Sequence, residues 1–224
     1  MINYTLTRSN RKSIGIYVRD AGVEVRAPLR TKKADIDKFV ESKEKWITDK
    51  LAQINERHDL RKSFVLNYGD TIVYRNREYP ISARKGNYMG FDNNCFFMPE
   101  NLSNEEIKRV CVEIYRRLAK RDLTIIANDY AKIMGVVPAA VKINSAKSRW
   151  GSCSGKNSIN FSWRLIMADD EVIDYVVIHE LAHILELNHS KRFWEIVQNM
   201  LPDYRERKER LNELQRRLSN EDWD

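Results

Sequence analysis

One segment of the sequence, residues 170–187, constrains the fold more than any other. Its periodicity predicts a helix that is capped by Asp169 or Asp170 and ends near Leu187, with apolar side chains on nearly all of its faces. A helix that is apolar all round is stable only when other elements enclose it, so we expect this one in the core. A chain of 224 residues is long enough to build such a core in one large domain or two small ones.

Three polar residues, His179, Glu180 and His183, interrupt the apolar pattern of this helix. Four residues turn an α-helix through about 400°, so the two imidazoles leave the same face and can share one metal ion. Glu180 lies on the next edge, where it can reach a metal-bound water without being a ligand. The alternative is a chance motif with core histidines bonded to backbone, but burying these groups without partners is costly, which favours a metal site.

A third metal ligand is expected just after the helix. His189 follows His179 by ten residues, the spacing of the extended metzincin motif, although Glu186 occupies that motif's glycine position. Glu186 competes as the third ligand because it lies on the same helix face as His179. We prefer His189, which requires the helix to end, with Asn188 as the expected left-handed terminator and Ser190 as the start of the next helix. Glu186 then orients a ligand imidazole or is solvated.

This set of groups predicts an enzyme. Three protein ligands leave a fourth position for water, which distinguishes catalytic from structural zinc, so we expect one catalytic Zn²⁺ per chain. Zinc lowers the pKa of its bound water to around 7 and polarises a carbonyl. Glu180 would act as general base, taking the proton of that water and passing it to the leaving group.

The N-terminal hundred residues are predicted to be rich in β-structure. Alternating apolar residues on both sides of Asp20-Ala21-Gly22 indicate a hairpin over residues 14–28. One amphipathic helix is expected over residues 33–58. Short strands separated by Gly and Asn residues follow, at residues 70–74, 78–83 and 95–98, and Pro99 closes this part.

The rest of the chain is predicted to be mainly helical. Ser103 and Glu106 form a capping box for a long helix over residues 104–134. A strand at 141–144, a polar loop at 145–157 and a strand at 158–166 precede the apolar helix, and two further helices follow it, the last over 204–218. We therefore predict an α+β chain, with a β-rich region at 1–100 and a mainly helical catalytic region with a small sheet at 101–224, or one continuous domain.

Charge and composition restrict the partners and the compartment. The net charge of +7 is concentrated at the N-terminus, since residues 1–65 hold 15 basic and 9 acidic residues while residues 141–224 hold 13 and 14. This basic region can attract a nucleotide or nucleic acid. Because no apolar run approaches the roughly 20 residues of a bilayer span and the first residues lack a secretory signal, we expect no membrane contact and a cytoplasmic protein. Three cysteines without zinc-type pairing argue against a disulfide framework.

Several segments around this helix form a further pattern, namely Arg149–Ser154, Ile159–Leu165, Ile173–His183, Asn188–Ser190 and Phe193-Trp194. Together they resemble the YgjP-like metallopeptidase family of predicted zinc-dependent metal hydrolases. Arg11–Ile14, Val23–Pro28 and Trp46-Ile47 also look like the N-terminal region of that family. The resemblance implies a zincin-like catalytic half behind a β-rich half, with His179, His183 and His189 as ligands and Glu180 as base. The family is also similar to zincin proteases that act on DNA-bound proteins, and some members are described as nucleoside triphosphate pyrophosphatases.

The resemblance also suggests where substrate binds. In zincins a strand near the active helix often pairs with an extended peptide, and residues 158–166 look like that strand. The loop at residues 149–154 is expected beside the metal. The candidate substrate-binding residues are Arg149, Trp150, Asn160 and Trp163, although for each tryptophan taken alone we favour a core position.

Three functions are compatible with these features. We favour a zinc-dependent metallopeptidase that acts on a peptide or protein. The alternative is a metal-dependent nucleoside triphosphate pyrophosphatase or phosphohydrolase, but such enzymes usually hold Mg²⁺ on carboxylates, whereas a three-histidine site favours zinc. A nucleic-acid-associated module with a structural metal ranks last, because no nucleic-acid fold signature is present and Glu180 would have no role.

Overall fold

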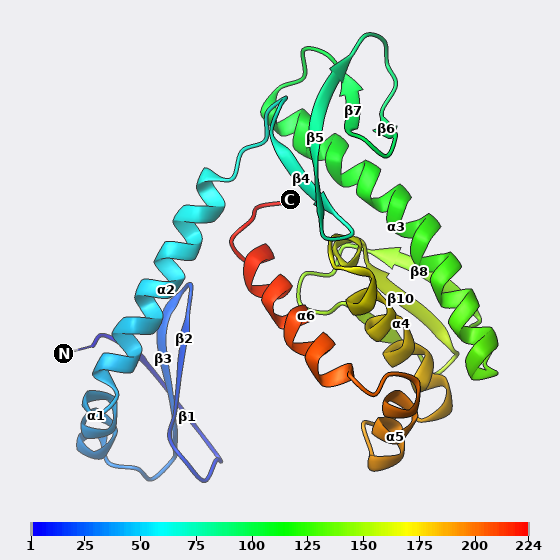
Figure 1. The fold of residues 1–224 in the computed structure, drawn as a ribbon. Helices are drawn as coiled ribbons and strands as arrows, with labels where there is room; N and C mark the ends of the chain where they lie inside the picture. The colour runs from blue at the N-terminus through cyan, green and yellow to red at the C-terminus, as the bar shows by residue number, and fades with distance from the viewer. Residues whose placement is uncertain (1, 224) are drawn as a thin grey trace. The chain divides into compact units, whose positions relative to one another are not determined.

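The computed structural model describes residues 2–223, and within them the chain forms six α-helices and three small sheets (Figure 1). This is the α+β class predicted from the sequence. Contacts divide the chain into two compact units. The first runs to Phe64 and includes Ser219–Asp222, and the second is Val65–Leu218 with Trp223. The boundary expected between residues 100 and 101 falls inside the second unit, and the division into domains stays a prediction.

The first unit is built on a three-stranded sheet of order β1-β3-β2, formed by β1 (Thr5–Ser9), β2 (Gly15–Arg19) and β3 (Gly22–Pro28). Strands β2 and β3 are antiparallel, as the hairpin pattern predicts, and Gly22 takes the φ of 108° that the turn requires. Strand β1 was not expected, and it pairs parallel to β3.

Two helices, α1 (Lys33–Glu41) and α2 (Glu44–Ser63), stand where the sequence predicts one over residues 33–58. The single-helix prediction is wrong because the chain breaks at Ser42, whose backbone N–H donates to Lys38 O and whose hydroxyl donates to Phe39 O, which closes the end of α1. The break lets Ile36 and Ile47 both pack into the buried cluster that includes Val25.

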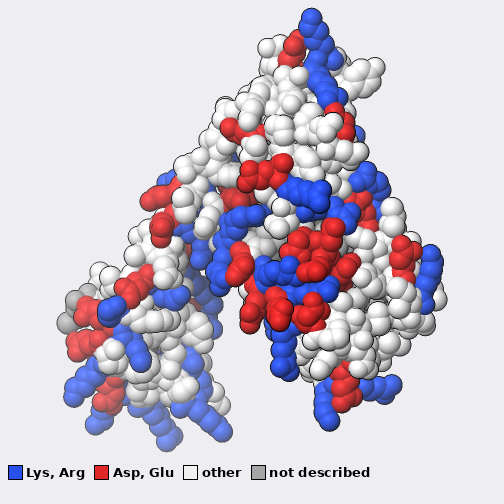
Figure 2. All heavy atoms as spheres, viewed as in Figure 1, with Lys and Arg blue, Asp and Glu red and all other residues white. Residues whose placement is uncertain are grey.

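The positive charge of the first unit gathers on the loops that follow its parallel strands. Residues 10–14 after β1 and 29–32 after β3 include Arg11, Lys12, Arg30 and Lys32 and hold no acidic residue. Figure 2 shows Lys and Arg side chains projecting from the surface that this unit forms at the lower left. The predicted N-terminal concentration of charge is therefore a property of these loops.

The second unit begins with a four-stranded sheet of order β4-β5-β7-β6. Its strands are β4 (Thr71–Tyr74), β5 (Arg77–Arg84), β6 (Gly90–Phe91) and β7 (Phe96–Pro99). The three predicted strands of this region are confirmed, and the two-residue β6 was too short to be expected from its pattern.

The long helix α3 (Asn104–Met134) has the predicted bounds. Ser103 and Glu106 form the expected capping box, and Gly135 ends the helix in the left-handed conformation, with φ of 67°. Helix α3 packs on α4 (Asp170–Leu185) and on the short 3-10 helix η1 (Trp163–Met167).

The third sheet has the order β8-β10-β9, from β8 (Ala140–Asn144), β9 (Gly151–Cys153) and β10 (Ser158–Ser162). The expectation that residues 158–166 pair with a peptide is wrong, because β10 is the central strand and its backbone pairs with β8 on one side and β9 on the other. Strand β9 falls within the polar loop predicted over residues 145–157. It lies at the edge of this sheet and contacts α4.

Helix α4 is the core of the second unit, as its apolar composition predicts. It packs against α3, β9, α5 (Lys191–Met200) and α6 (Tyr204–Leu218) (Figure 1). Asp169 is its N-cap, accepting from Val172 N–H, and the helix ends at Leu185 rather than near Leu187. Among the helices of residues 2–223, none is long and apolar enough to span a membrane, and the cytoplasmic location stays a prediction.

Candidate metal centre

Three of the four histidines come together at one end of α4. His179 and His183 lie one turn apart on the helix, and His189 approaches them from the link between α4 and α5. One ring nitrogen from each lies within 4.8 Å of the others, and His179 Nε2 is 3.1 Å from His189 Nε2. Among the described residues this is the one His, Cys, Asp and Glu group that could hold a metal, and Glu186 is outside it.

The link that carries His189 turns back in a way that the sequence did not indicate. Glu186 leaves the helix in an extended conformation, with φ of −144° and ψ of 108°, while its N–H still bonds to Ala182 O. Asn188 was expected to end the helix in the left-handed conformation, and this is wrong, since its φ is not positive and the helix has already ended. Ser190 then caps α5, as predicted, by accepting from Phe193 N–H.

A backbone contact orients the His183 ring. Its Nδ1 lies 3.2 Å from the carbonyl oxygen of Glu186. Because a carbonyl can only accept, Nδ1 carries the proton and Nε2 keeps its lone pair. Glu186 thus supports a candidate ligand through its main chain, a role that does not depend on its carboxylate.

The electrostatics of the cluster keep His179 and His183 neutral, which is the form that binds metals. Burial, reinforced by His183 and His189, lowers the pKa of His179 to about 3. Burial also lowers the pKa of His183. The buried Nδ1 of His179 has no hydrogen-bond partner among the residues described.

The donor set fits a zinc ion. A tetrahedral zinc with Zn–N bonds of about 2.0–2.1 Å holds its ligand nitrogens roughly 3.3 Å apart, close to the 3.1 Å between His179 Nε2 and His189 Nε2. Two imidazole nitrogens this close together need either a proton or a metal ion between them. Imidazole nitrogens suit zinc, whereas Mg²⁺ and Ca²⁺ prefer oxygen ligands.

Aromatic side chains at the start of α5 hold the three rings. The buried Phe193 ring lies 4.9 Å from His179, 4.5 Å from His183 and 4.7 Å from His189, measured between centroids. Trp194 stacks on His189 at 5.7 Å. Neither aromatic was assigned to the site from spacing, although both directly follow the cap that positions His189.

Glu180 is buried beside the histidines, with 6% of its surface exposed. Burial raises its pKa to about 7, opposed by the charge of Arg149. Gly151 of β9 lies directly against it: a Cβ at Gly151 would be 2.5 Å from Glu180 Cγ and 2.6 Å from Oε1. Only glycine leaves room for the carboxylate in this position, and a glycine inside a strand is the sequence signal that would have indicated such an approach.

A cavity of about 180 Å³ opens beside His179 and Glu180. The other residues that line it are Trp150, Gly151, Tyr175, Val176 and Leu211, from α4, α6 and the segment leading into β9. Tyr175, Val176 and Leu211 were not among the predicted site residues, because α6 meets α4 only in the tertiary structure.

The four candidate substrate-binding residues lie in different places. Trp150 lines the cavity, and Arg149 is exposed with its charge acting on Glu180. Asn160 is on the central strand β10. Trp163 is 1% exposed and stacks on Tyr115 of α3 at 5.5 Å, a core position away from the cavity lining.

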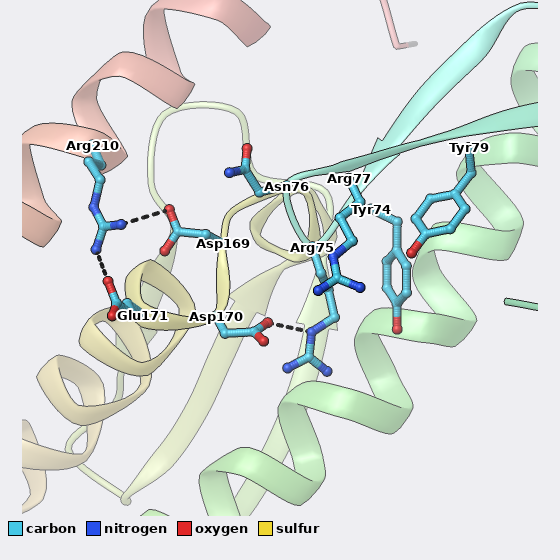
Figure 3. A pocket seen from close by; sticks show the side chains of 9 residues that line it. All are labelled: Tyr74, Arg75, Asn76, Arg77, Tyr79, Asp169, Asp170, Glu171 and Arg210. Atoms are coloured by element: carbon cyan, nitrogen blue, oxygen red, sulfur yellow. Dashed lines mark hydrogen bonds and ion pairs between the residues drawn. The ribbon is translucent and has the colours of Figure 1, made fainter. Parts of the chain in front are cut away.

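A second pocket, of about 450 Å³, lies at the other end of α4 (Figure 3). Five of its six charged side chains pair with one another: Arg75 with Asp170, and Arg210 of α6 with both Asp169 and Glu171. These ion pairs join the β4–β5 turn and α6 to the first turn of α4, so we assign this pocket a structural role in fixing the helix that carries the histidines.

Two solved structures are similar, each with a TM-score of 0.38: the metallopeptidase zymogens abylysin of Pyrococcus abyssi and jannalysin of Methanocaldococcus jannaschii. Abylysin is 24% identical to this chain, and the match covers 45% of this chain and 98% of abylysin. Jannalysin is 21% identical, and the match covers 41% of this chain and 95% of jannalysin. No curated protein matches the chain. The family model of the YgjP-like metallopeptidase domain matches residues 12–214. The chain therefore belongs to the YgjP-like metallopeptidase family, and it is a hydrolase by that membership.

Proposed function

We propose that this protein is a zinc-dependent peptidase, with the zinc held by His179, His183 and His189. The observation that carries the proposal is the convergence of these three imidazoles beside a buried carboxylate at the edge of a cavity. Three protein ligands leave a position open for reaction, as in catalytic zinc sites. When bound there, zinc lowers the pKa of water to around 7 and polarises the carbonyl that is attacked.

Glu180 is the general base in this proposal. Its carboxylate accepts the proton of the attacking water and returns it to the departing amine nitrogen. The backbone of Gly151 lies directly against Glu180, and this contact restricts the movement of the carboxylate on the β9 side. The Glu186 carbonyl and the Phe193 ring hold the imidazoles in orientation, so that their Nε2 atoms face a common point.

A peptide suits this site better than a nucleoside triphosphate. Strand β9 offers a backbone edge beside Glu180, and an extended peptide binds such an edge through main-chain hydrogen bonds. A triphosphate needs cations around it, yet among the described residues lining the cavity none is Lys or Arg.

Substitution of Glu180 tests the mechanism. Glu180→Gln keeps the shape of the side chain but removes the base, so we expect unchanged zinc content and loss of casein or peptide hydrolysis by about 10²-fold or more. Glu195→Gln, an exposed glutamate of α5, is the control and should change neither quantity. Nucleoside triphosphates are assayed in parallel. Release of pyrophosphate alone, abolished in Glu180→Gln, would reject the peptidase proposal in favour of the phosphohydrolase.

A further inference from the structure

We infer that the cavity beside Glu180 is a specificity pocket, which receives one uncharged apolar side chain from the residue that flanks the scissile bond of the peptide. The inference rests on the proposed function and adds the substrate class. It is carried by the position, walls, size and charge of the cavity.

The position of the cavity places its occupant next to the reacting bond. Tyr175 and Val176 lie one helical turn before His179 and Glu180, so wall and candidate catalytic groups share one face of α4. Since His179 and Glu180 themselves line the cavity, a side chain inside it belongs to a residue adjacent to the carbonyl under attack.

The walls of the cavity are apolar and fixed. Tyr175 is 4% exposed, Val176 is 3% exposed and Leu211 is 8% exposed. The Trp150 indole completes the lining beside the bare backbone of Gly151. Because Tyr175, Val176 and Leu211 are buried, these walls of the cavity are preformed, and an apolar side chain that enters removes apolar surface from water without rearranging them.

The size of the cavity selects a single side chain. An apolar cavity of about 150 Å³ accommodates benzene, whereas sites for drug-sized ligands start at about 300 Å³. At about 180 Å³ the cavity suits an aliphatic side chain or one phenyl ring. A nucleoside or an indole with its flanking chain exceeds this volume.

The charge of the cavity excludes ionised side chains. Tyr175 contributes a phenol, an uncharged group, to the lining. Glu180 lies at the end of the cavity nearest to the candidate metal centre. In the proposed function, its carboxylate there is engaged by the reacting water. A Lys or Asp side chain entering the cavity would lose its hydration against indole, phenol and aliphatic walls.

Leu211 sets the volume of the pocket from a separate element. It comes from α6, which contributes no other residue to the cavity lining. Leu214 lies on the same stripe of α6 with the same 8% exposure but lines a different pocket, with Val172 and Met167. Leu214→Ala is therefore a matched control for Leu211→Ala, equal in side chain, helix and burial.

The experiment measures kcat/KM of the zinc-loaded full-length protein on a peptide series. The peptides differ only at one residue flanking the scissile bond, with Gly, Ala, Val, Leu, Phe, Trp, Lys and Asp placed there, and both flanking positions are varied in turn. At one position we expect Leu or Phe to exceed Ala by at least about tenfold, with Lys and Asp below Ala. Equal rates at both positions, or a preference for a charged residue, would overturn the inference while leaving the peptidase intact.

The Leu211 variants then assign the pocket. Leu211→Ala should move the preference toward Phe and Trp, and Leu211→Phe toward Ala and Val, while Leu214→Ala keeps the wild-type order. An unchanged order in a folded Leu211 variant overturns the assignment. Zinc content verifies folding, and the wild-type peptide series remains decisive if either variant fails to fold.

A binding measurement separates this inference from the proposed function. Titration calorimetry of the same peptides against zinc-loaded Glu180→Gln reports the pocket without any hydrolysis. If wild type cleaves no peptide but Glu180→Gln binds the Leu and Phe peptides at least about tenfold more tightly than the Ala peptide, the peptidase fails and the pocket stands. If no peptide is bound, the inference falls as well.

Discussion

At the scale of single residues, the close approach of Gly151 to Glu180 is the contact that most constrains the site. A carboxylate that has to accept a proton must be held within a fraction of an ångström, and here one wall of its position is a backbone without a side chain. The space that a methyl group would need is already filled by the carboxyl group itself.

Gly151→Ala should therefore displace Glu180 and reduce peptide hydrolysis by about 10²-fold, the effect expected of a shift of about 1 Å in a reacting group. Zinc content should stay unchanged, because the three atoms nearest to the new methyl group all belong to Glu180 and Glu180 is not a proposed ligand. Gly155→Ala is the control, since a Cβ there meets no atom within 4 Å. Full activity in Gly151→Ala would show that the contact does not position the base.

The third metal ligand is also decided at this scale. We expect His189→Ala to lower zinc affinity by about 100-fold or more, beyond the 10–100-fold typical of residues that only support a ligand. Glu186→Ala should retain zinc, because the carbonyl that holds His183 remains. Both variants are dialysed against a series of chelators, and the zinc bound per chain is then measured by atomic absorption. The exposed His58→Ala is the control. The reverse result moves the ligand to Glu186.

At the scale of elements, the link between α4 and α5 determines whether His189 meets its partners. The link is short because α4 ends at Leu185 and Ser190 starts α5, so the cap of α5 fixes the residue directly before it. Spacing alone predicts that a turn is needed, but the backbone conformation that makes it, extended at Glu186, is seen only in the structure.

Ser190→Ala should consequently have two effects. Loss of the cap costs about 0.5–2 kcal/mol in the free energy of unfolding, and the freed α5 terminus should also weaken zinc binding several-fold. Ser103→Ala removes the equivalent cap of α3 and should reduce stability by a similar amount with zinc affinity unchanged. Urea unfolding and zinc competition titrations compare the two variants. Equal zinc affinity in both would mean that the cap does not hold His189.

At the scale of the whole molecule, the chain has two compact units and the candidate site lies in one of them. The buried cluster around Val25 and Ile47 is confined to the first unit, while α4 is enclosed by elements of the second. The excess of positive charge belongs to the first unit, and the candidate metal centre belongs to the second.

Ile47→Ala should destabilise the first unit by about 2–5 kcal/mol, because it removes a fully buried side chain from a small core. Below its unfolding transition, zinc content and peptide hydrolysis should be those of the wild type. Leu123→Ala, an equally buried position of α3, should instead destabilise the unit that holds the site. Calorimetry and amide hydrogen exchange on the full chain show which of the two units each variant destabilises. Loss of zinc in Ile47→Ala would contradict the independence of the units.

The sequence by itself determined what depends on short-range geometry. The common face of His179 and His183, the burial of α4 and the caps of α3, α4 and α5 all follow from helical periodicity within a few residues. The break at Ser42 escaped prediction because Ile36, Val40 and Ile47 fit a continuous helix almost equally well, and only their packing on the sheet separates the two arrangements.

Tertiary structure alone decided which strand is an edge, which glycine touches the candidate base and which residues form the cavity. Gly151 and Leu211 are far from Glu180 along the chain, and both reach it through sheet order and the packing of α6 on α4. Helical spacing reports one face of one element, whereas a cavity is the space left between several. The candidate metal ligands of this protein can therefore be predicted from its sequence, whereas its candidate specificity pocket exists only in the folded chain.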